Sequence, residues 1–300
     1  MTDQAGIAEE TPSAGWRGKF AGLALAVAVF SVLWFMAGAL GSKYGLWSWQ
    51  FGLGVMYLGW GIIVAGGALA MSILALIIGL AAAPRKRPVM LSLGALLISG
   101  LVAGRLAGIG AGAESLPPLH DIQTDWSDPI VFSETLMAIR EADGATNPVL
   151  AAPTIPEAAE GRWPGLGGRL VSEVQEEAEF DPETMKEPED AAYPYSFDTV
   201  ILEGDLAGIA ESAEQVATGM GWEIVTPAST QSADLETQVE AIETSAWFGF
   251  KDDIAVRLRA VDEGVAVDVR STSRVGLSDL GANAKRVDLY LTELKRVAAT

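Results

Sequence analysis

The sequence of 300 residues contains no cysteine and a single histidine, His120. The lack of cysteine excludes disulfides, zinc–thiolate sites, iron–sulfur clusters and cysteine nucleophiles. With one histidine, a multi-histidine metal site is excluded as well, and a Ser-His-Asp triad would have to use His120. Gly-rich phosphate loops, the dinucleotide-binding fingerprint and the G-x-S-x-G motif are absent. We therefore expect no cofactor, no metal site and no catalytic residues.

Acidic residues are scarce in the first part of the chain and basic residues in the second. Residues 1–111 carry a net charge of +4, whereas residues 112–300 carry −23, for a total of −19. About half of all residues are nevertheless hydrophobic (50%). The split predicts a membrane region followed by a separate acidic domain. Such a domain repels a phosphate backbone, so we expect no nucleic-acid partner.

Three apolar stretches predict membrane-spanning helices, at about residues 20–40, 60–83 and 89–109, after an N-terminal tail of residues 1–19. A helix of 21 residues is about 31 Å long, which matches a hydrocarbon core of roughly 30 Å. We expect the aromatic start of the second stretch, with Trp47, Trp49 and Tyr57, to lie at the membrane interface. Ala37-Gly38-Ala39 resembles a signal-peptide cleavage site, but the long apolar run and the spans after it favour a retained helix.

Basic residues predict the orientation of the spans. Arg17 and Lys19 precede the first span, and Arg85, Lys86 and Arg87 join the second to the third. Basic ends stay in the cytoplasm, so we expect a multi-pass protein of a bacterial inner membrane with a cytoplasmic N-terminus. Three spans would place the acidic domain in the periplasm. If only two spans insert, the domain is cytoplasmic.

Gly100, Gly104 and Gly108 recur every fourth residue in the third span and share one helix face. Such a face allows close approach of another helix. It indicates either an interface with a partner or second copy, or packing against the first two spans. We favour packing within the chain.

Two polar regions are expected to precede the folded domain. Residues 112–150 read as an extended tether with a short helix at about 131–141, for which Ser133 is a candidate cap. Residues 151–192 read as an acidic, Pro-rich, solvated insertion with a short exposed helix at 171–179. A metal site of His120, Asp121, Asp125 and Asp128 is the alternative for the tether, but a polar connection is favoured.

Residues 193–300 predict an α+β domain. The expected order is a strand, a helix, four strands and a long C-terminal helix, with helices covering one face of an antiparallel sheet. The strands are expected at 197–202, 222–225, 239–250, 253–260 and 265–275, and the helices at 205–218 and 280–297. Lys251-Asp252-Asp253 is expected to form the turn between the third and fourth strands.

The parity of the last two strands restricts their hairpin. Apolar residues are even-numbered in 253–260 and odd-numbered in 265–275, so paired residue numbers must sum to an odd value. The loop around residues 262–264 is then two or four residues long. A two-residue loop pairs Arg257 with Asp268, and a four-residue loop pairs Arg259 with Asp268.

Either register gathers arginines on one sheet face. The candidate ligand-binding residues are Arg257, Arg259, Asp268, Arg270 and Arg274, with Lys251, Asp252 and Asp253 at a loop edge. Guanidinium groups suit carboxylates or phosphates, so this face is a candidate anion site. The alternative, which we favour, is a solvated outer face whose arginines answer acidic neighbours.

Several motifs resemble those of one family. They are P-L-H-D-I (residues 118–122), N-P-V (147–149), G-F-K-D-D (249–253), V-D-V-R-S (267–271) and S-D-L-G (278–281). Together they resemble the domain of unknown function 1499, over roughly residues 117–297. The chain departs from that pattern at the insertion 151–192, and at Y-P-Y-S (193–196) where the family more often reads Y-P-D-I. The resemblance implies no accepted activity and fits a membrane-tethered bacterial envelope protein.

These observations favour a binding or interaction module over an enzyme. The expected partners are the lipid bilayer and a membrane or periplasmic protein. One alternative is an enzyme or anionic-ligand site on the arginine-rich face. Another is an apolar ligand bound between the sheet and the C-terminal helix, which would need an apolar cavity of about 300 Å³ or more.

Overall fold

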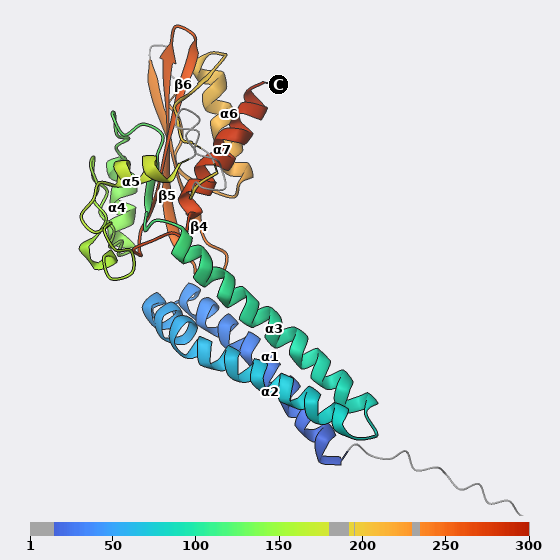
Figure 1. The fold of residues 1–300 in the computed structure, drawn as a ribbon. Coiled ribbons are helices and arrows are strands. Elements are labelled where there is room, and N and C mark those ends of the chain that lie inside the picture. Colours follow the sequence, from blue (N-terminus) through green and yellow to red (C-terminus); the bar gives the residue numbers. More distant parts are fainter. Residues whose placement is uncertain (1–14, 180–191, 195, 230–234, 300) are drawn as a thin grey trace, which may run out of the picture. The chain divides into compact units, whose positions relative to one another are not determined.

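The computed structural model describes residues 15–179, 192–194, 196–229 and 235–299 (Figure 1). The chain divides into two compact units. One comprises Met1–Gly110 and Trp247–Gly249, and the other comprises Ala111–Ala246 and Phe250–Thr300. We call them the helical unit and the α+β unit.

The helical unit is built from three long apolar helices. They are α1 (Gly15–Lys43), η1 (Gln50–Trp60) continuing as α2 (Gly61–Ala81), and α3 (Lys86–Ser115). By length and hydropathy, the segments Gly15–Lys43, Gln50–Ala81 and Lys86–Ala113 could each cross a membrane. A continuous helix satisfies its own backbone groups, as a hydrocarbon core requires.

The second helix begins earlier than the sequence predicted. The segment expected at the interface forms an 11-residue π-helix, η1, which runs directly into α2. The indole of Trp34 donates to the Met56 carbonyl at 2.8 Å, and that of Trp47 donates to the Gly38 carbonyl at 3.2 Å. Some of the aromatic residues therefore join neighbouring segments of the bundle. The sequence could not distinguish that role from interfacial anchoring.

The apolar helices meet through small side chains. The Oγ of Ser99 on α3 donates to the Oγ of Ser72 on α2 at 3.2 Å. Small residues let helix backbones approach closely where lipid removes the hydrophobic drive for association. The buried cluster at this contact consists of Ala24, Ala28, Ala75 and Ala95.

The glycine face of α3 takes no part in this contact. A Cβ added at Gly100, Gly104 or Gly108 would meet no atom within 4 Å in the described part of the chain. The interpretation that we favoured from the sequence, packing against the first two spans, is therefore wrong for these three positions. The periodicity of the glycines was real, but it could not tell which residues along α3 would contact the other helices.

The α+β unit contains a six-stranded antiparallel sheet in the order β1–β6–β5–β4–β3, with β2 also paired to β6. β1 and β2 therefore share the outer edge of β6, one towards each end. The strands are β1 (Asp121–Gln123), β2 (Val200–Leu202), β3 (Glu223–Thr226), β4 (Glu236–Thr244), β5 (Lys251–Val261) and β6 (Gly264–Ser273). The predicted α+β class and the order from β2 onward are confirmed.

The β5–β6 hairpin has the shorter of the two loops that parity allowed. Val261 pairs with Gly264, which leaves a two-residue loop, and Arg257 pairs with Asp268. Arg259 consequently lies opposite Ala266.

The turn before β5 lies earlier than predicted. Ser245 and Phe250 close it, because the Ser245 N–H donates to the Phe250 carbonyl and the Phe250 N–H donates to the Ser245 hydroxyl, each at 2.8 Å. Lys251, Asp252 and Asp253, which were expected to form this turn, begin β5 instead. Their turn preference is overridden because each side chain finds a partner of opposite charge: Asp143 for Lys251, Arg286 for Asp252, and Arg274 after β6 for Asp253.

Helices α6 (Leu206–Gly219) and α7 (Ala282–Ala298) cover one face of the sheet (Figure 1). The predicted cap of α6 is confirmed, since the Asp205 carboxylate accepts from the Gly208 N–H at 2.8 Å. Tyr290 of α7 stacks on Trp222 with ring centroids 5.0 Å apart, and its hydroxyl donates to the Ala213 carbonyl at 3.1 Å. A pair of this kind contributes about 1 kcal/mol beyond its buried area.

The opposite face of the sheet is covered as well, by α4 (Glu134–Ala142) and its flanking loops. Ser133 caps α4 as predicted, accepting from the Leu136 N–H at 3.2 Å. The buried carboxylate of Glu240 accepts from the Ser133 N–H at 2.5 Å and so fixes the start of α4 on β4. A second small core of Ile130, Phe132, Leu136, Ile242 and Ala255 lies beneath it.

The predicted extended tether and solvated insertion are both wrong in their descriptions of packing. Asp121–Gln123 is strand β1 and is completely buried. In the insertion, α5 (Val171–Ala178) buries Val171 and Val174 in the main core. Residues 180–191 lie outside the described residues. Local composition is polar in both segments, but a few apolar residues at suitable spacing are enough to bury one side of each.

Helix α5 also covers the free edge of β1. The side-chain amide of Gln175 accepts from the Gln123 N–H at 3.3 Å and donates to the Gln123 carbonyl at 2.9 Å. It thus replaces the hydrogen bonds of a further strand. Covering an edge in this way prevents pairing with other chains.

Gly264 makes the close approach of β2 to the hairpin possible. Its φ is +138°, and an added Cβ would overlap the Leu202 carbonyl oxygen.

We expect Gly264→Ala to lower the free energy of unfolding by about 3 kcal/mol, because alanine would strain both the backbone conformation and the β2–β6 contact. Thermal unfolding of the full-length protein in detergent measures this. Gly219→Ala at the end of α6 is the control, since its Cβ would meet nothing within 4 Å. Equal behaviour of the two variants would contradict the prediction.

Candidate functional site

The sequence-predicted site residues divide between the two faces of the sheet. Alternation along β5 and β6 turns seven of them towards α4, and Asp252 alone turns towards α7. We call the first set, with its four arginines, the arginine face. It consists of Lys251, Asp253, Arg257, Arg259, Asp268, Arg270 and Arg274.

Arg270 is the most completely enclosed arginine of the arginine face, with 1% of its surface exposed. It donates from Nε and Nη2 to the two carboxylate oxygens of Asp121, at 3.0 and 2.6 Å. Further hydrogen bonds run to the carbonyls of Ile130 and Leu150, each 2.7 Å long. The rings of Trp126 and Phe132 lie 5.6 and 5.7 Å from the guanidinium carbon. Arg270 therefore ties β6 to the segment that covers it.

Arg257 and Arg259 share two carboxylates. Both donate to the Asp268 Oδ2, at 3.0 and 2.7 Å, and both donate to the Asp128 Oδ2 at 3.0 Å. The other oxygen of Asp268 accepts from the Thr199 and Thr124 hydroxyls, at 2.5 and 3.1 Å. Asp268 is fully buried, so these donors replace the water that its charge loses.

Asp253 lies between two arginines at the other end of the face. It accepts from Arg140 of α4, and from Arg274 Nη2 at 2.6 Å. Arg274 also donates to Asp143, which accepts from Lys251 at 2.5 Å. The hydrogen bond from Lys251 is the main cause that lowers the pKa of the Asp143 carboxyl.

The arginine face is thus not the solvated outer face that the sequence favoured, although its arginines do pair with acidic neighbours as that interpretation expected. Its charges are matched inside the chain, mostly by aspartates from residues 121–150, which we call the cover segment. Arg257 and Arg274 are only 5% and 3% exposed. Six cations, Arg140, Lys251, Arg257, Arg259, Arg270 and Arg274, meet six carboxylates, Asp121, Asp125, Asp128, Asp143, Asp253 and Asp268.

Asp252 belongs to a separate polar group at the start of α7. It accepts from Arg286 Nη2 at 2.6 Å, and Arg286 also donates to Glu243 and to the Ser271 hydroxyl. Asn283, which is fully buried, donates to the His120 carbonyl at 3.1 Å. The sequence analysis missed Arg286 and Asn283. The available signal was their spacing on the helix, because Asn283 lies four residues before the buried Val287 and Arg286 lies four residues before the buried Tyr290.

Two titratable groups border this polar group. The Asp279 carboxylate accepts from the N–H groups of Gly281 and Asn283, each at 2.8 Å, and burial raises the pKa of Asp279 to about 6. Burial lowers the pKa of His120, and within the described residues its Nδ1 atom has no hydrogen-bond partner. Leu280, which follows Asp279, has a left-handed φ of 56°. In the described part of the chain, no three His, Asp or Glu side chains form a metal site.

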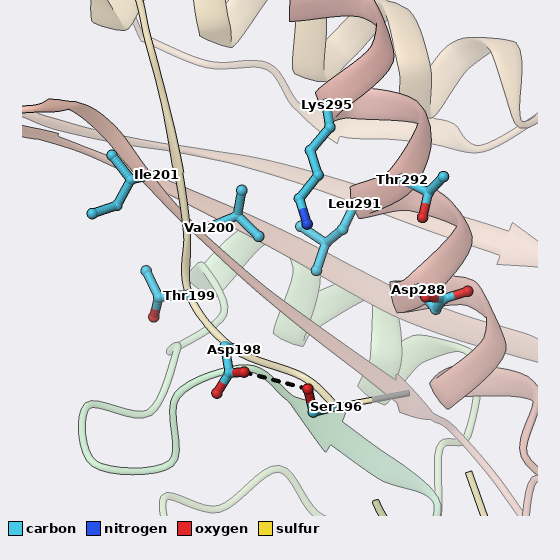
Figure 2. Close-up of a pocket in the computed structure, with 9 residues that line it drawn as sticks. All are labelled: Ser196, Asp198, Thr199, Val200, Ile201, Asp288, Leu291, Thr292 and Lys295. Carbon is cyan, nitrogen blue, oxygen red and sulfur yellow. Dashed lines mark hydrogen bonds between the residues drawn. The ribbon is translucent and has the colours of Figure 1, made fainter. Parts of the chain in front are cut away.

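A cleft of about 390 Å³ lies between residues 196–201 and α7 (Figure 2). We call it the α7 cleft. Figure 2 shows Lys295 extending from α7 towards Leu291 and Val200, with Asp288 further along the helix. Burial raises the pKa of Asp288, and the nearby Lys295 opposes that shift. The remaining lining residues are Ser196, Asp198, Thr199, Ile201 and Thr292.

The wall of the α7 cleft that leads into β2 directs its side chains to both faces of the sheet. Val200 faces α7 because it pairs with Val267 of the core face, whereas Thr199 turns its hydroxyl to Asp268 on the arginine face. Ser196 donates to Asp198 at 3.4 Å at one end of the cleft. Amine, carboxylate and hydroxyl groups thus surround a small apolar floor, and the cleft has the size of sites for small ligands.

A comparison with protein-family models finds a match over the α+β unit. The model described as "Protein of unknown function (DUF1499)" matches residues 121–294. Among curated proteins and solved structures, none matches the chain. The matched range includes the cover segment, the sheet and most of α7.

Asp253→Asn tests whether the arginine face stabilises the fold. We expect this variant to lose about 3 kcal/mol of unfolding free energy, because Arg140 and Arg274 would keep buried charges without their shared carboxylate. The control is Glu293→Gln, which removes an exposed pair with Arg296 and should change stability by no more than about 0.5 kcal/mol. Thermal unfolding in detergent measures both. A loss for Asp253→Asn as small as the control would contradict the structural role.

Proposed function

The chain belongs to the DUF1499 family of proteins of unknown function, and we propose that it is a membrane-anchored envelope protein whose α+β unit is a binding module. The three apolar helices are compatible with membrane anchoring. The finer parts of the proposal are the side of the membrane and the binding role, and each has its own support.

The location outside the cytoplasm is supported by charge. Arg17 and Lys19 lie at the start of α1, and Lys86 and Arg87 begin α3, so both basic ends would remain inside. Three crossings then carry the chain to the outer side of a bacterial inner membrane. Residues 112–300 carry a net charge of −23, and an anionic inner membrane surface would repel a region of that charge.

The binding role rests on the α7 cleft. It combines a volume of about 390 Å³ with an ammonium group, Lys295, that forms no ion pair among the described residues. The arginine face offers less to a ligand, because its guanidinium groups already hold carboxylates of the chain. The cleft also suits an apolar ligand less well, because such a ligand would cover the polar side chains of Asp198, Asp288 and Thr292 without bonding to them.

The proposed orientation can be tested by labelling thiols, because a chain without cysteine makes every introduced cysteine unique. Glu263→Cys lies in the β5–β6 loop, and Ala82→Cys lies between α2 and α3. We expect a membrane-impermeant maleimide to label Glu263→Cys in intact spheroplasts and Ala82→Cys only after lysis. Labelling of Glu263→Cys only after lysis would refute the outer location.

The binding role can be tested by hydrogen exchange of the full-length protein in detergent. The panel of probes is a free amino acid, a short peptide, a disaccharide and a fatty acid. We expect at least one class to slow exchange in residues 196–203 and 288–295, because a bound ligand shields the amides of both cleft walls. Peptides from α4, on the other face, are the internal control. If no class slows exchange at the cleft, the binding role is wrong.

A further inference from the structure

Strand β2 has an outer edge whose backbone groups point away from the sheet. The odd-numbered residues of β6 direct their backbone N–H and carbonyl groups towards β1 and β2. Two hydrogen bonds indicate this: Thr124 N–H donates to the Val269 carbonyl (3.1 Å), and Ser273 N–H donates to the His120 carbonyl (2.8 Å). Ile201 lies opposite the even-numbered Ala266. Its N–H and carbonyl therefore point outward, because these groups alternate along an antiparallel strand.

This edge differs from that of β1. Gln175 of α5 occupies the backbone groups of Gln123 there. Among the described residues, no side chain bonds to the Ile201 backbone in this way. The backbone edge of β2 is thus available to an added strand, whereas that of β1 is not.

Helix α7 provides the charged wall beside this edge. Asp288 and Lys295 both line the α7 cleft and lie seven residues apart, which is about 10 Å along a helix. Asp198 adds a second carboxylate from the segment leading into β2. The cleft therefore offers a cation, Lys295, and separate carboxylates, Asp198 and Asp288. Val200 on one wall and Leu291 on the other add apolar surface.

We propose that the α7 cleft binds a short peptide in extended conformation, which pairs with the free edge of β2. Its terminal carboxylate lies at Lys295, and its ammonium group lies at Asp198 and Asp288. Backbone hydrogen bonds supply affinity in such strand addition, and flanking side chains supply selectivity. This proposal rests on the proposed role of the cleft as a binding site and names the ligand class.

The experiment uses trialanine with free termini and the full-length protein in detergent. Hydrogen exchange should slow at the Ile201 amide, which gains a partner, and change little at the Val200 amide, which already faces β6. Titration calorimetry should show about tenfold weaker binding for N-acetyl-trialanine and for trialanine amide, since each lacks one charged end.

Matched variants on α7 assign the charged end. Lys295→Met should weaken trialanine binding about tenfold and remove the preference for trialanine over its amide. Lys285→Met, an exposed lysine on the same helix outside the cleft, should leave both unchanged. Equal binding by Lys295→Met and the unmodified protein would overturn the proposal.

The outcomes separate this proposal from the broader binding role. If the disaccharide or the fatty acid slows exchange at the cleft and trialanine does not, the proposal of a peptide ligand is wrong, while the broader proposal of a binding role is supported. No protection by any probe would overturn both. Protection by trialanine that spares the Ile201 amide would overturn the pairing with β2.

Discussion

Ion pairs between the arginine face and the cover segment decide how the α+β unit is built. A guanidinium group cannot be buried without a partner, and the cover segment supplies Asp121, Asp128 and Asp143 as partners. Once paired, these arginines bring a polar stretch of chain down onto the sheet and close its second face. The result is a sheet covered on both faces. Apolar contacts hold the cover of one face, and ion pairs together with a small apolar core hold the cover of the other.

This pairing also directs where a ligand could bind. The arginine donors are used within the chain, so the open polar groups lie elsewhere, beside α7. β1 and β2 divide the outer edge of β6, and α5 covers only the β1 part. Thr199 connects the two regions, because its hydroxyl bonds to Asp268 while its neighbour Val200 lines the cleft. Strain or loss in the ion-pair network would therefore reach the wall of the cleft.

The same network shapes the surface charge of the α+β unit. Residues 112–300 contain 13 basic residues, and most of those on the sheet are enclosed with carboxylates. Carboxylates outnumber basic residues in this part of the sequence, and an anionic membrane surface repels a region of net negative charge. The three apolar helices, by contrast, are compatible with membrane association.

Local pattern in the sequence determined the apolar helices, the caps Ser133 and Asp205, the α+β order and the parity of the β5–β6 hairpin, because these depend on neighbours three, four or two residues away. It could not determine that Asp252 and Asp253 would lie in strand β5 and not in a turn, or that residues 119–123 would be buried and not form a tether. Those outcomes depend on Arg286, Arg274 and Arg270, which are distant in sequence and become partners only when the sheet assembles. Tertiary structure alone decided which arginines were already paired and which edge stayed open, since burial and pairing of charge are properties of the folded surface.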